Sequence, residues 1–231
     1  MIQGNAVQSI SRAFLEDDGF IAQGRSAFPV HATGTCYAFD LDGTVTREEL
    51  LPLIAMELGL ETEIALLTRL TMDGMIPFED SFRLRFALLR TAGLERIQSI
   101  VAEVELDPFI AEFIRKNRDR CFVVTGNLDI WIAPLMEKLG CGYFASTAML
   151  DEGRVIGLRE VMRKSVPALQ LKERFERVIA VGDGFNDIPM FDVADIGVAF
   201  QGIHTAPDAL VSVSNYVALD GSSLCRLLST L

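Results

Sequence analysis

Short runs of apolar residues recur along the chain from residue 35 onwards. Each run is rich in β-branched and aromatic residues and shows no alternation between apolar and polar positions. This pattern is typical of parallel strands that are buried on both faces of a sheet. The runs lie at 35–41, 120–126, 141–146, 177–184 and 195–200, with a weaker one at 215–219.

The segments that separate these runs carry apolar residues at the spacing of a helix. The segment 107–119 begins with Asp-Pro, which suits the first turn of a helix, and 128–140 ends in glycine, which suits a helix end. Further helical patterns lie at 166–177 and 221–231. Alternating strands and helices predict an α/β fold, a Rossmann-like open parallel sheet flanked by helices.

One long segment interrupts the alternation, because residues 46–106 show four helical patterns and no strand pattern. We predict a helical cap domain at 46–106, inserted into a core domain made of 35–45 and 107–231. Residues 1–34 are predicted to form an amphipathic N-terminal extension packed on the core. An insert after the first strand lies over the carboxyl ends of the strands, where open α/β sheets bind ligands, and suits a lid.

Composition and charge narrow the classes of partner. The 231 residues are half hydrophobic, which suits a core domain with an insert, and the net charge of −11 disfavours nucleic acid. The first residues show no basic region followed by an apolar core, so we expect no secretory signal, and no apolar run approaches the 18 or so residues of a membrane helix. Its four cysteines have no metal-binding spacing. We expect a cytoplasmic monomer or homodimer that contacts no membrane.

Polar residues follow the predicted strands at their carboxyl ends. Because these ends meet at one edge of a parallel sheet, the side chains are expected to converge. Carboxylates without histidine or thiolate ligands suit Mg²⁺. The residues are Asp40, Asp42, Thr125, Gly126, Asp183, Asn186 and Asp187, and Lys164 begins a helical pattern just before the strand at 177–184.

The two aspartates of FDLDGTVT suggest a division of roles. A carboxylate attacks phosphorus to form an aspartyl-phosphate, and Asp40, close to Mg²⁺ and Lys164, suits that nucleophile. Asp42 suits the acid that protonates the leaving oxygen and the base that activates water. Asp183 and Asp187 would complete the metal site, and the Thr125 hydroxyl would hold phosphoryl oxygens.

Four stretches, in the order FDLDGTVT, FVVTGNLD, RKSVPAL and VGDGFNDIPM, resemble the motifs of haloacid dehalogenase superfamily phosphatases. The sequence is most similar to the phosphoserine phosphatase branch, which carries a helical cap after the first motif. The resemblance implies a haloacid dehalogenase-like core and a Mg²⁺ site that also uses the backbone carbonyl of Asp42. The implied roles are nucleophile at Asp40, acid/base at Asp42, lysine motif at Lys164, phosphate binding at Thr125 and Gly126, metal binding at Asp183, and support at Asn186 and Asp187.

The predicted cap carries a second part of the resemblance. Glu49, nine residues after Asp40, stands where the branch contacts the substrate amine, and MDGMIPFEDSFRLR places Met72, Phe78 and Arg85 at cap positions. Arg85 would bind the substrate carboxylate with both arms of its guanidinium. The implied partner is a small phosphorylated metabolite, O-phospho-L-serine, cleaved to L-serine and phosphate in serine biosynthesis.

Several alternatives stay open at this point. Glu49 also suits a first-turn acid favoured by the helix dipole, Arg85 a solvated face, and Met72 and Phe78 a core. Thr125 and Asn127 depart from the serine and glycine more usual in the branch, so another small phosphomonoester, such as a phospho-amino alcohol, is an alternative substrate. A non-catalytic binding protein on the same scaffold is a second alternative. A dehalogenase is a third, although it needs neither Asp42 nor Mg²⁺.

Overall fold

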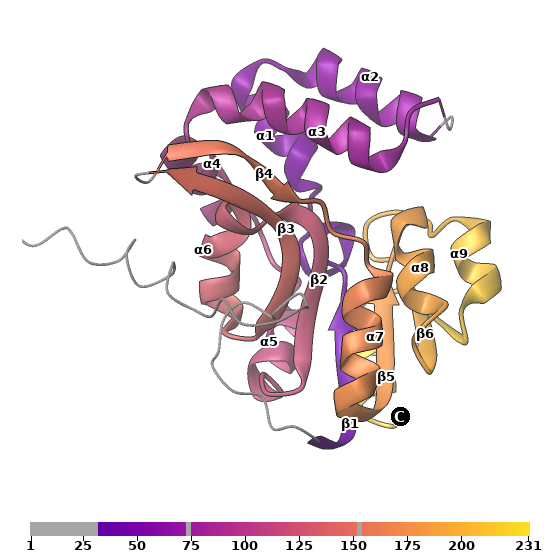
Figure 1. Cartoon of the computed structure of the whole chain (residues 1–231). Coiled ribbons are helices and arrows are strands. Elements are labelled where there is room, and N and C mark those ends of the chain that lie inside the picture. The colour runs from indigo at the N-terminus through magenta and orange to yellow at the C-terminus, as the bar shows by residue number, and fades with distance from the viewer. Residues whose placement is uncertain (1–31, 73–74, 152–153) are drawn as a thin grey trace, which may run out of the picture.

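The computed structural model describes residues 32–72, 75–151 and 154–231, and its strands form one sheet (Figure 1). The strand order is β4-β3-β2-β1-β5-β6-β7. All neighbours pair in parallel except β3 and β4. This confirms the predicted α/β class. The strands are β1 (Ala32–Phe39), β2 (Cys121–Leu128), β3 (Gly142–Asp151), β4 (Arg154–Glu160), β5 (Phe175–Gly182), β6 (Ile196–Phe200) and β7 (Tyr216–Ala218).

The sequence pattern did not predict the antiparallel strand β4, nor the short helices at 188–191 and 208–213. Strand β4 forms a hairpin with β3 at the edge of the sheet. Its residues are mostly exposed or half-buried, and Ile156 is 55% exposed. An edge strand of this kind lacks the continuous apolar run of a strand buried on both faces, so its residues do not show the pattern that predicts such strands.

Helices cover both faces of the sheet, and alternate residues of β1 point to opposite sides. Tyr37 and Phe39 pack into a core with α5 (Pro108–Lys116), α6 (Asp129–Leu139) and α10 (Gly221–Leu228). Cys36 and Ala38 pack into a second core with α7, α8 and α9. The period of two along a strand therefore divides the interior into two layers. These last helices are α7 (Ser165–Arg174), α8 (Ile188–Phe191) and α9 (Asp208–Val213).

Helix ends follow the signals in the sequence. Asp107 caps α5, accepting hydrogen bonds from the backbone N–H groups of Phe109 and Ile110 at 3.0 and 3.1 Å. Gly140 ends α6 in the left-handed conformation, with φ of 67°. Both observations confirm the predicted N-terminus and C-terminus.

Four helices occupy the range 46–106, as predicted, and three of them lie together beyond the carboxyl end of β1 (Figure 1). The fourth, α4, packs beside α6, where Gln98 donates to the carbonyl of Ile130 at 2.7 Å. Among the described residues of this range the one strand-like feature is a bridge between Thr46 and Leu106. The helices are α1 (Leu50–Leu58), α2 (Glu61–Met72), α3 (Phe78–Leu89) and α4 (Leu94–Ala102), with a short 3₁₀ turn at Arg90–Ala92.

The predicted N-terminal extension lies outside the described residues up to position 31. Residues 32–34, which the prediction placed in that extension, belong to β1 instead. No helix in the described part of the chain is long and apolar enough to cross a membrane.

Candidate active site

The predicted polar residues gather where β1, β2 and β5 end. Asp40 directly follows β1, and its backbone N–H donates to Val181 of β5 at 2.8 Å. Thr125 lies on β2, which pairs with the other side of β1. Asp183 directly follows β5. Parallel pairing on both sides of β1 thus brings these three residues to one edge of the sheet, as the sequence predicted.

Lys164 links two carboxylates in the interior of this site. Its Nζ lies 2.5 Å from Oδ1 of Asp40 and 2.6 Å from Oδ1 of Asp187. All three side chains are at most 4% exposed. Burial by itself lowers the pKa of Lys164, but Asp187 and Asp40 reverse this effect, and the net shift is upward. The lysine therefore stays protonated between the two acids.

The second oxygen of Asp187 organises the loop that carries Asp183. It accepts hydrogen bonds from the backbone N–H groups of Asp183 and Gly184, both at 3.0 Å. A Cβ on Gly182 would come 2.3 Å from Cγ of Asp187, so only glycine leaves room for this carboxylate. Asp187 thus connects the loop after β5 to Lys164, and it fixes the position of Asp183.

Three carboxylates of the site are close enough to share one cation. Asp40, Asp183 and Asp187 each offer an oxygen, and these oxygens lie within 4.8 Å of one another. Gly43 stands against the same group, with φ of 70°, and a Cβ there would come 2.1 Å from Oδ2 of Asp183. The chain can therefore turn beside Asp183 only with glycine at position 43.

The carboxylate of Asp42 has different partners from that of Asp40. Its Oδ1 accepts from the backbone N–H of Leu50, at the start of α1, at 2.8 Å. Its Oδ2 accepts from the side-chain amide of Asn127 on β2. Burial and then the charge of Glu49 raise the pKa of Asp42 to about 7, although these hydrogen bonds and Lys164 act in the other direction. The two aspartates of the first motif thus occupy distinct environments, as the sequence suggested.

Negative charge exceeds positive charge throughout the cluster. Burial, followed by Asp187, raises the pKa of Asp183 to about 7. Burial and the neighbouring carboxylates also raise the pKa of Asp40 well above its usual value, against the opposing effect of Lys164. One ammonium group does not balance four carboxylates in a region of low dielectric. The possible ligands are all oxygen atoms of carboxylates with surplus negative charge, which fits a hard divalent cation.

Arg85 lies inside the molecule rather than on the solvated face that was one of the alternatives. It projects from α3, is 9% exposed, and its Nε has no hydrogen-bond partner among the described residues. Burial lowers the pKa of this guanidinium, whereas Glu49 raises it. Glu49 itself has an exposed side chain and precedes α1. A buried guanidinium with a free donor is a binding group for an anion.

The other predicted residues take varied positions. Phe78 at the start of α3 lies over Gly126, where a Cβ would come 3.1 Å from the ring. Asn186 is exposed beside Gly184, and Thr125 is fully buried. Met72 is the last residue of α2, and its side chain lies outside the described residues.

Sequence reasoning recorded Asn127 as a departure but did not foresee its contact with Asp42. The two residues are 85 positions apart in the chain, and Asn127 is 4% exposed. The only available signal was that both follow neighbouring strands. The contact of Leu50 with Asp42 was also missed, because a backbone donor leaves no mark in the residue types.

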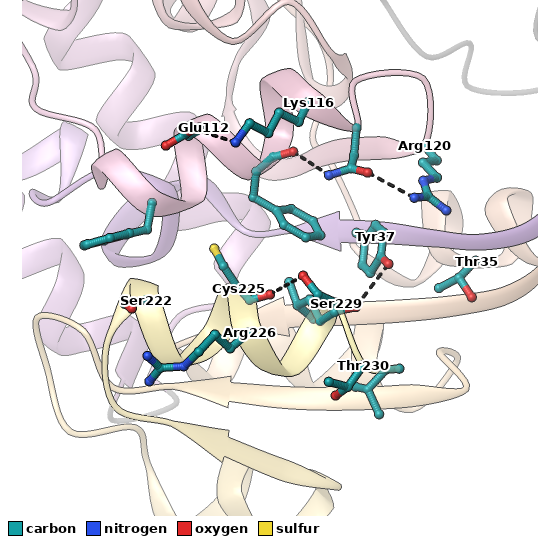
Figure 2. A pocket seen from close by; sticks show the side chains of 15 residues that line it. Thr35, Tyr37, Glu112, Lys116, Arg120, Ser222, Cys225, Arg226, Ser229 and Thr230 are labelled. Carbon is teal, nitrogen blue, oxygen red and sulfur yellow. Dashed lines mark hydrogen bonds and ion pairs between the residues drawn. The ribbon is translucent and has the colours of Figure 1, made fainter.

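Away from these residues, a hollow lies between α5 and α10, beside the amino-terminal part of β1 (Figure 2). Its volume is about 860 Å³. Thr35 and Tyr37 of β1 line it, and the ion pair of Glu112 with Lys116 stands at its wall (Figure 2). None of the predicted site residues lines this hollow.

Comparison with known proteins places the chain among hydrolases. A family model described as haloacid dehalogenase-like hydrolase matches residues 37–192, which is more than half of the chain. A second model with the same description matches residues 167–221.

Named relatives are phosphoserine phosphatases. That of Methanocaldococcus jannaschii is 32% identical over 175 residues, which cover 70% of this chain and 83% of the relative. That of Streptomyces coelicolor is 31% identical over 195 residues, which cover 78% of this chain and 47% of the relative. The chain therefore spans most of one relative and about half of the other.

Solved structures give the same picture. A phospho-aspartyl intermediate analogue of phosphoserine phosphatase matches with a TM-score of 0.68 at 27% identity, covering 88% of this chain and 100% of that one. A substrate-bound phosphoserine phosphatase complex matches with a TM-score of 0.69 at 27% identity, covering 87% and 99%.

Proposed function

The chain belongs to the haloacid dehalogenase-like hydrolases, and from this premise we propose that it is a Mg²⁺-dependent phosphoserine phosphatase that works through an aspartyl-phosphate on Asp40. One observation carries the proposal. The two carboxylates of the first motif are held apart, Asp40 by Lys164 and Asp42 by Leu50 and Asn127. A nucleophile and an acid/base need such different surroundings.

The carboxylates of Asp40, Asp183 and Asp187, with the backbone carbonyl of Asp42, are the groups that would hold Mg²⁺. Their oxygen ligands and surplus negative charge suit this ion. When bound, the ion would neutralise charge on the phosphoryl group of the substrate.

In the first half of the reaction Asp40 attacks phosphorus. A bond forms between its carboxylate oxygen and phosphorus while the bond from phosphorus to the serine oxygen breaks. Lys164, 2.5 Å from Oδ1 of Asp40, orients this carboxylate and offsets the charge that gathers on the phosphoryl oxygens. Protonated Asp42 gives its proton to the departing serine oxygen.

In the second half the same two carboxylates exchange tasks. Asp42, now ionised, takes a proton from water as the water oxygen attacks phosphorus, and Asp40 leaves as a free carboxylate. A pKa of about 7 lets Asp42 donate a proton in one step and accept one in the next at neutral pH. We assign the phosphoryl oxygens to the Thr125 hydroxyl, the backbone N–H of Gly126 and the side chain of Asn186.

The cap side of the site supports a substrate that is an amino acid. The buried guanidinium of Arg85 has a free Nε, which suits a carboxylate, and Glu49 suits an ammonium group. Phe78 covers Gly126. A phospho-amino alcohol lacks the carboxylate and would leave Arg85 without a partner.

The test compares two substrates in two variants. Arg85→Ala should lower kcat/KM for phosphoserine by roughly 100-fold, because a charge-assisted pair contributes about 2–3 kcal/mol, and should change phosphoethanolamine turnover little. Arg83→Ala is the matched control, since Arg83 is exposed and pairs with Glu79 at 2.8 Å. Equal kcat/KM for phosphoserine in wild type and Arg85→Ala would refute the serine assignment.

The remaining proposals concern setting and partners. All four cysteines are free, and three are buried, which suits a reducing compartment such as the cytoplasm. The acidic net charge favours a small phosphorylated metabolite over nucleic acid. One chain supplies every assigned site residue, and we propose a monomer or homodimer.

A further inference from the structure

Asn127 contacts the acid/base, but the reaction steps described above give its side chain no role. It lies near the end of β2, is 4% exposed, and its side-chain amide donates to Oδ2 of Asp42. The same amide lies 3.3 Å from Oγ1 of Thr125, which also accepts the backbone N–H of Asn127 at 3.1 Å. One buried side chain thus joins the acid/base to the residue assigned to the phosphoryl group.

The carboxylate of Asp42 is held from two sides. The N–H of Leu50 reaches Oδ1 from α1, which follows the first motif, and Asn127 reaches Oδ2 from the sheet. With a single donor the carboxyl group keeps its freedom to rotate about the bond to its Cβ. With two donors on different oxygens the plane of the group is fixed.

The backbone around Asp42 explains why two donors to its carboxyl group matter. The residue follows β1 by three positions and precedes Gly43, whose φ of 70° turns the chain. The backbone around Asp42 is therefore a turn rather than a strand or helix. Asn127 lies near the carboxyl end of β2, the strand beside β1, and it ties the Asp42 carboxyl group to that strand.

We propose that Asn127 is a positioning residue for proton transfer, which holds the Asp42 carboxyl group in the orientation that reaches the leaving oxygen. The inference rests on the proposed function, since it concerns the proton that the departing alkoxide receives. In this role the Asn127 side chain contacts Asp42 and Thr125 and not the reacting atoms. Its effect on the reaction passes through Asp42.

A test needs substrates that differ in their need for that proton. Serine leaves phosphoserine as a poor alkoxide that requires protonation, whereas nitrophenolate leaves p-nitrophenyl phosphate as a stable anion. The value of kcat/KM covers steps up to the transfer of phosphorus to Asp40, so the later attack of water does not enter it. The ratio of kcat/KM between the substrates therefore reports proton donation.

Asn127→Leu keeps the approximate size of the side chain and removes its donor. It should lower kcat/KM for phosphoserine by about 10- to 30-fold, and for p-nitrophenyl phosphate by less than about threefold, because a misplaced acid slows only the step that needs it. Asp42→Asn should shift the same ratio further. Asn117→Leu is the control, since Asn117 donates to the carbonyl of Phe113 away from the site, and its ratio should equal that of wild type.

The outcomes separate this inference from the proposed function. Equal losses on both substrates would mean that Asn127 only supports the structure, and unchanged rates would mean that Asp42 needs no second donor; either result overturns the inference. Asn127→Ser, too short to reach Asp42, replaces the leucine variant if that protein does not fold. If wild type cleaves p-nitrophenyl phosphate and other alkyl phosphates but does not cleave phosphoserine, the serine assignment alone is refuted. A wild type that cleaves neither kind refutes both.

Discussion

Lys164 and Lys116 contact carboxylates at nearly the same distances, with very different consequences. Lys164 lies 2.5 and 2.6 Å from Asp40 and Asp187, and Lys116 lies 2.6 Å from Glu112 at the hollow between α5 and α10 (Figure 2). The first three side chains are at most 4% exposed, whereas Lys116 and Glu112 are 70% and 59% exposed. Distance alone therefore does not distinguish the contacts, and the water around them does.

Water screens the exposed pair, so its members act almost independently of each other. In the buried group no water replaces a missing partner, and removal of one charge leaves the others uncompensated. The buried group also holds more acids than one lysine can balance, a disadvantage for folding that a bound cation would remove. This difference leads us to treat the carboxyl edge of the sheet as the functional site.

The largest effect is expected from loss of the buried cation. Lys164→Met should lower the free energy of unfolding of the metal-free protein by about 3–5 kcal/mol at pH 8, because it leaves two buried carboxylates without their cation. Phosphate release should fall by about 100- to 1,000-fold. Urea unfolding and a phosphate assay measure the two quantities.

Lys116→Met is the matched control for that variant. The Lys116 side chain is 70% exposed, so both its stability and its activity should equal those of wild type. Equal stability losses in the two variants would show that burial does not separate the two regions.

A smaller effect is expected at the turn beside Asp183. Gly43→Ala should lower the free energy of unfolding by about 1–2 kcal/mol, because alanine is strained in the left-handed conformation. The collision of its Cβ with Asp183 should lower it further. Displacement of Asp183 should weaken Mg²⁺ binding by about 10- to 100-fold. Titration calorimetry measures the affinity.

Gly59→Ala separates strain from collision. Gly59 has φ of 67° with no atom within 4 Å of an added Cβ, so this variant should show the strain alone and bind Mg²⁺ as wild type does. Unaltered Mg²⁺ binding in Gly43→Ala would exclude Asp183 from the metal site.

The last expected effect is a dependence of stability and Mg²⁺ affinity on pH. Burial raises the pKa values of Asp42 and Asp183 from 3.8 to about 7. Between pH 4 and pH 7 the folded protein therefore binds more protons than the unfolded chain. The stability of the metal-free protein should therefore fall as pH rises from 4 to 7. Because protons compete with the ion at Asp183, Mg²⁺ affinity should be about tenfold higher at pH 8 than at pH 6.

Unfolding scans with EDTA and calorimetry at the two pH values test this dependence, with Asp183→Asn as the control that should reduce both effects. A metal-free stability that rises over the same range would contradict it.

Much of this site follows from the sequence because parallel strands obey a simple rule. Asp40, Thr125 and Asp183 come at the ends of buried apolar runs, and parallel pairing brings such ends together. The burial of Arg85 did not follow, since FEDSFRLRFALL also fits a solvated helix face, and only the packing of α3 decides. The strand β4 did not follow either, because its exposed residues lack the pattern of a buried strand.

The hydrogen bond between Asn127 and Asp42 could not be predicted from the sequence. Both residue types are visible in the chain, and both strand ends are predictable. Whether an amide at one end reaches a carboxylate at the next depends on the rotamers and on the turn at Gly43. These are properties of the packed structure.

We propose that Asp40 takes the phosphoryl group while a different carboxylate moves the proton. Acid-quenching the enzyme during turnover of phosphoserine with Mg²⁺, followed by peptide mass spectrometry, locates the phosphoryl group. We expect one phosphoryl group on Asp40 in wild type, and in Asp40→Asn neither a phosphoryl group nor turnover. A phosphoryl group on another residue, or continued hydrolysis by Asp40→Asn, would contradict it.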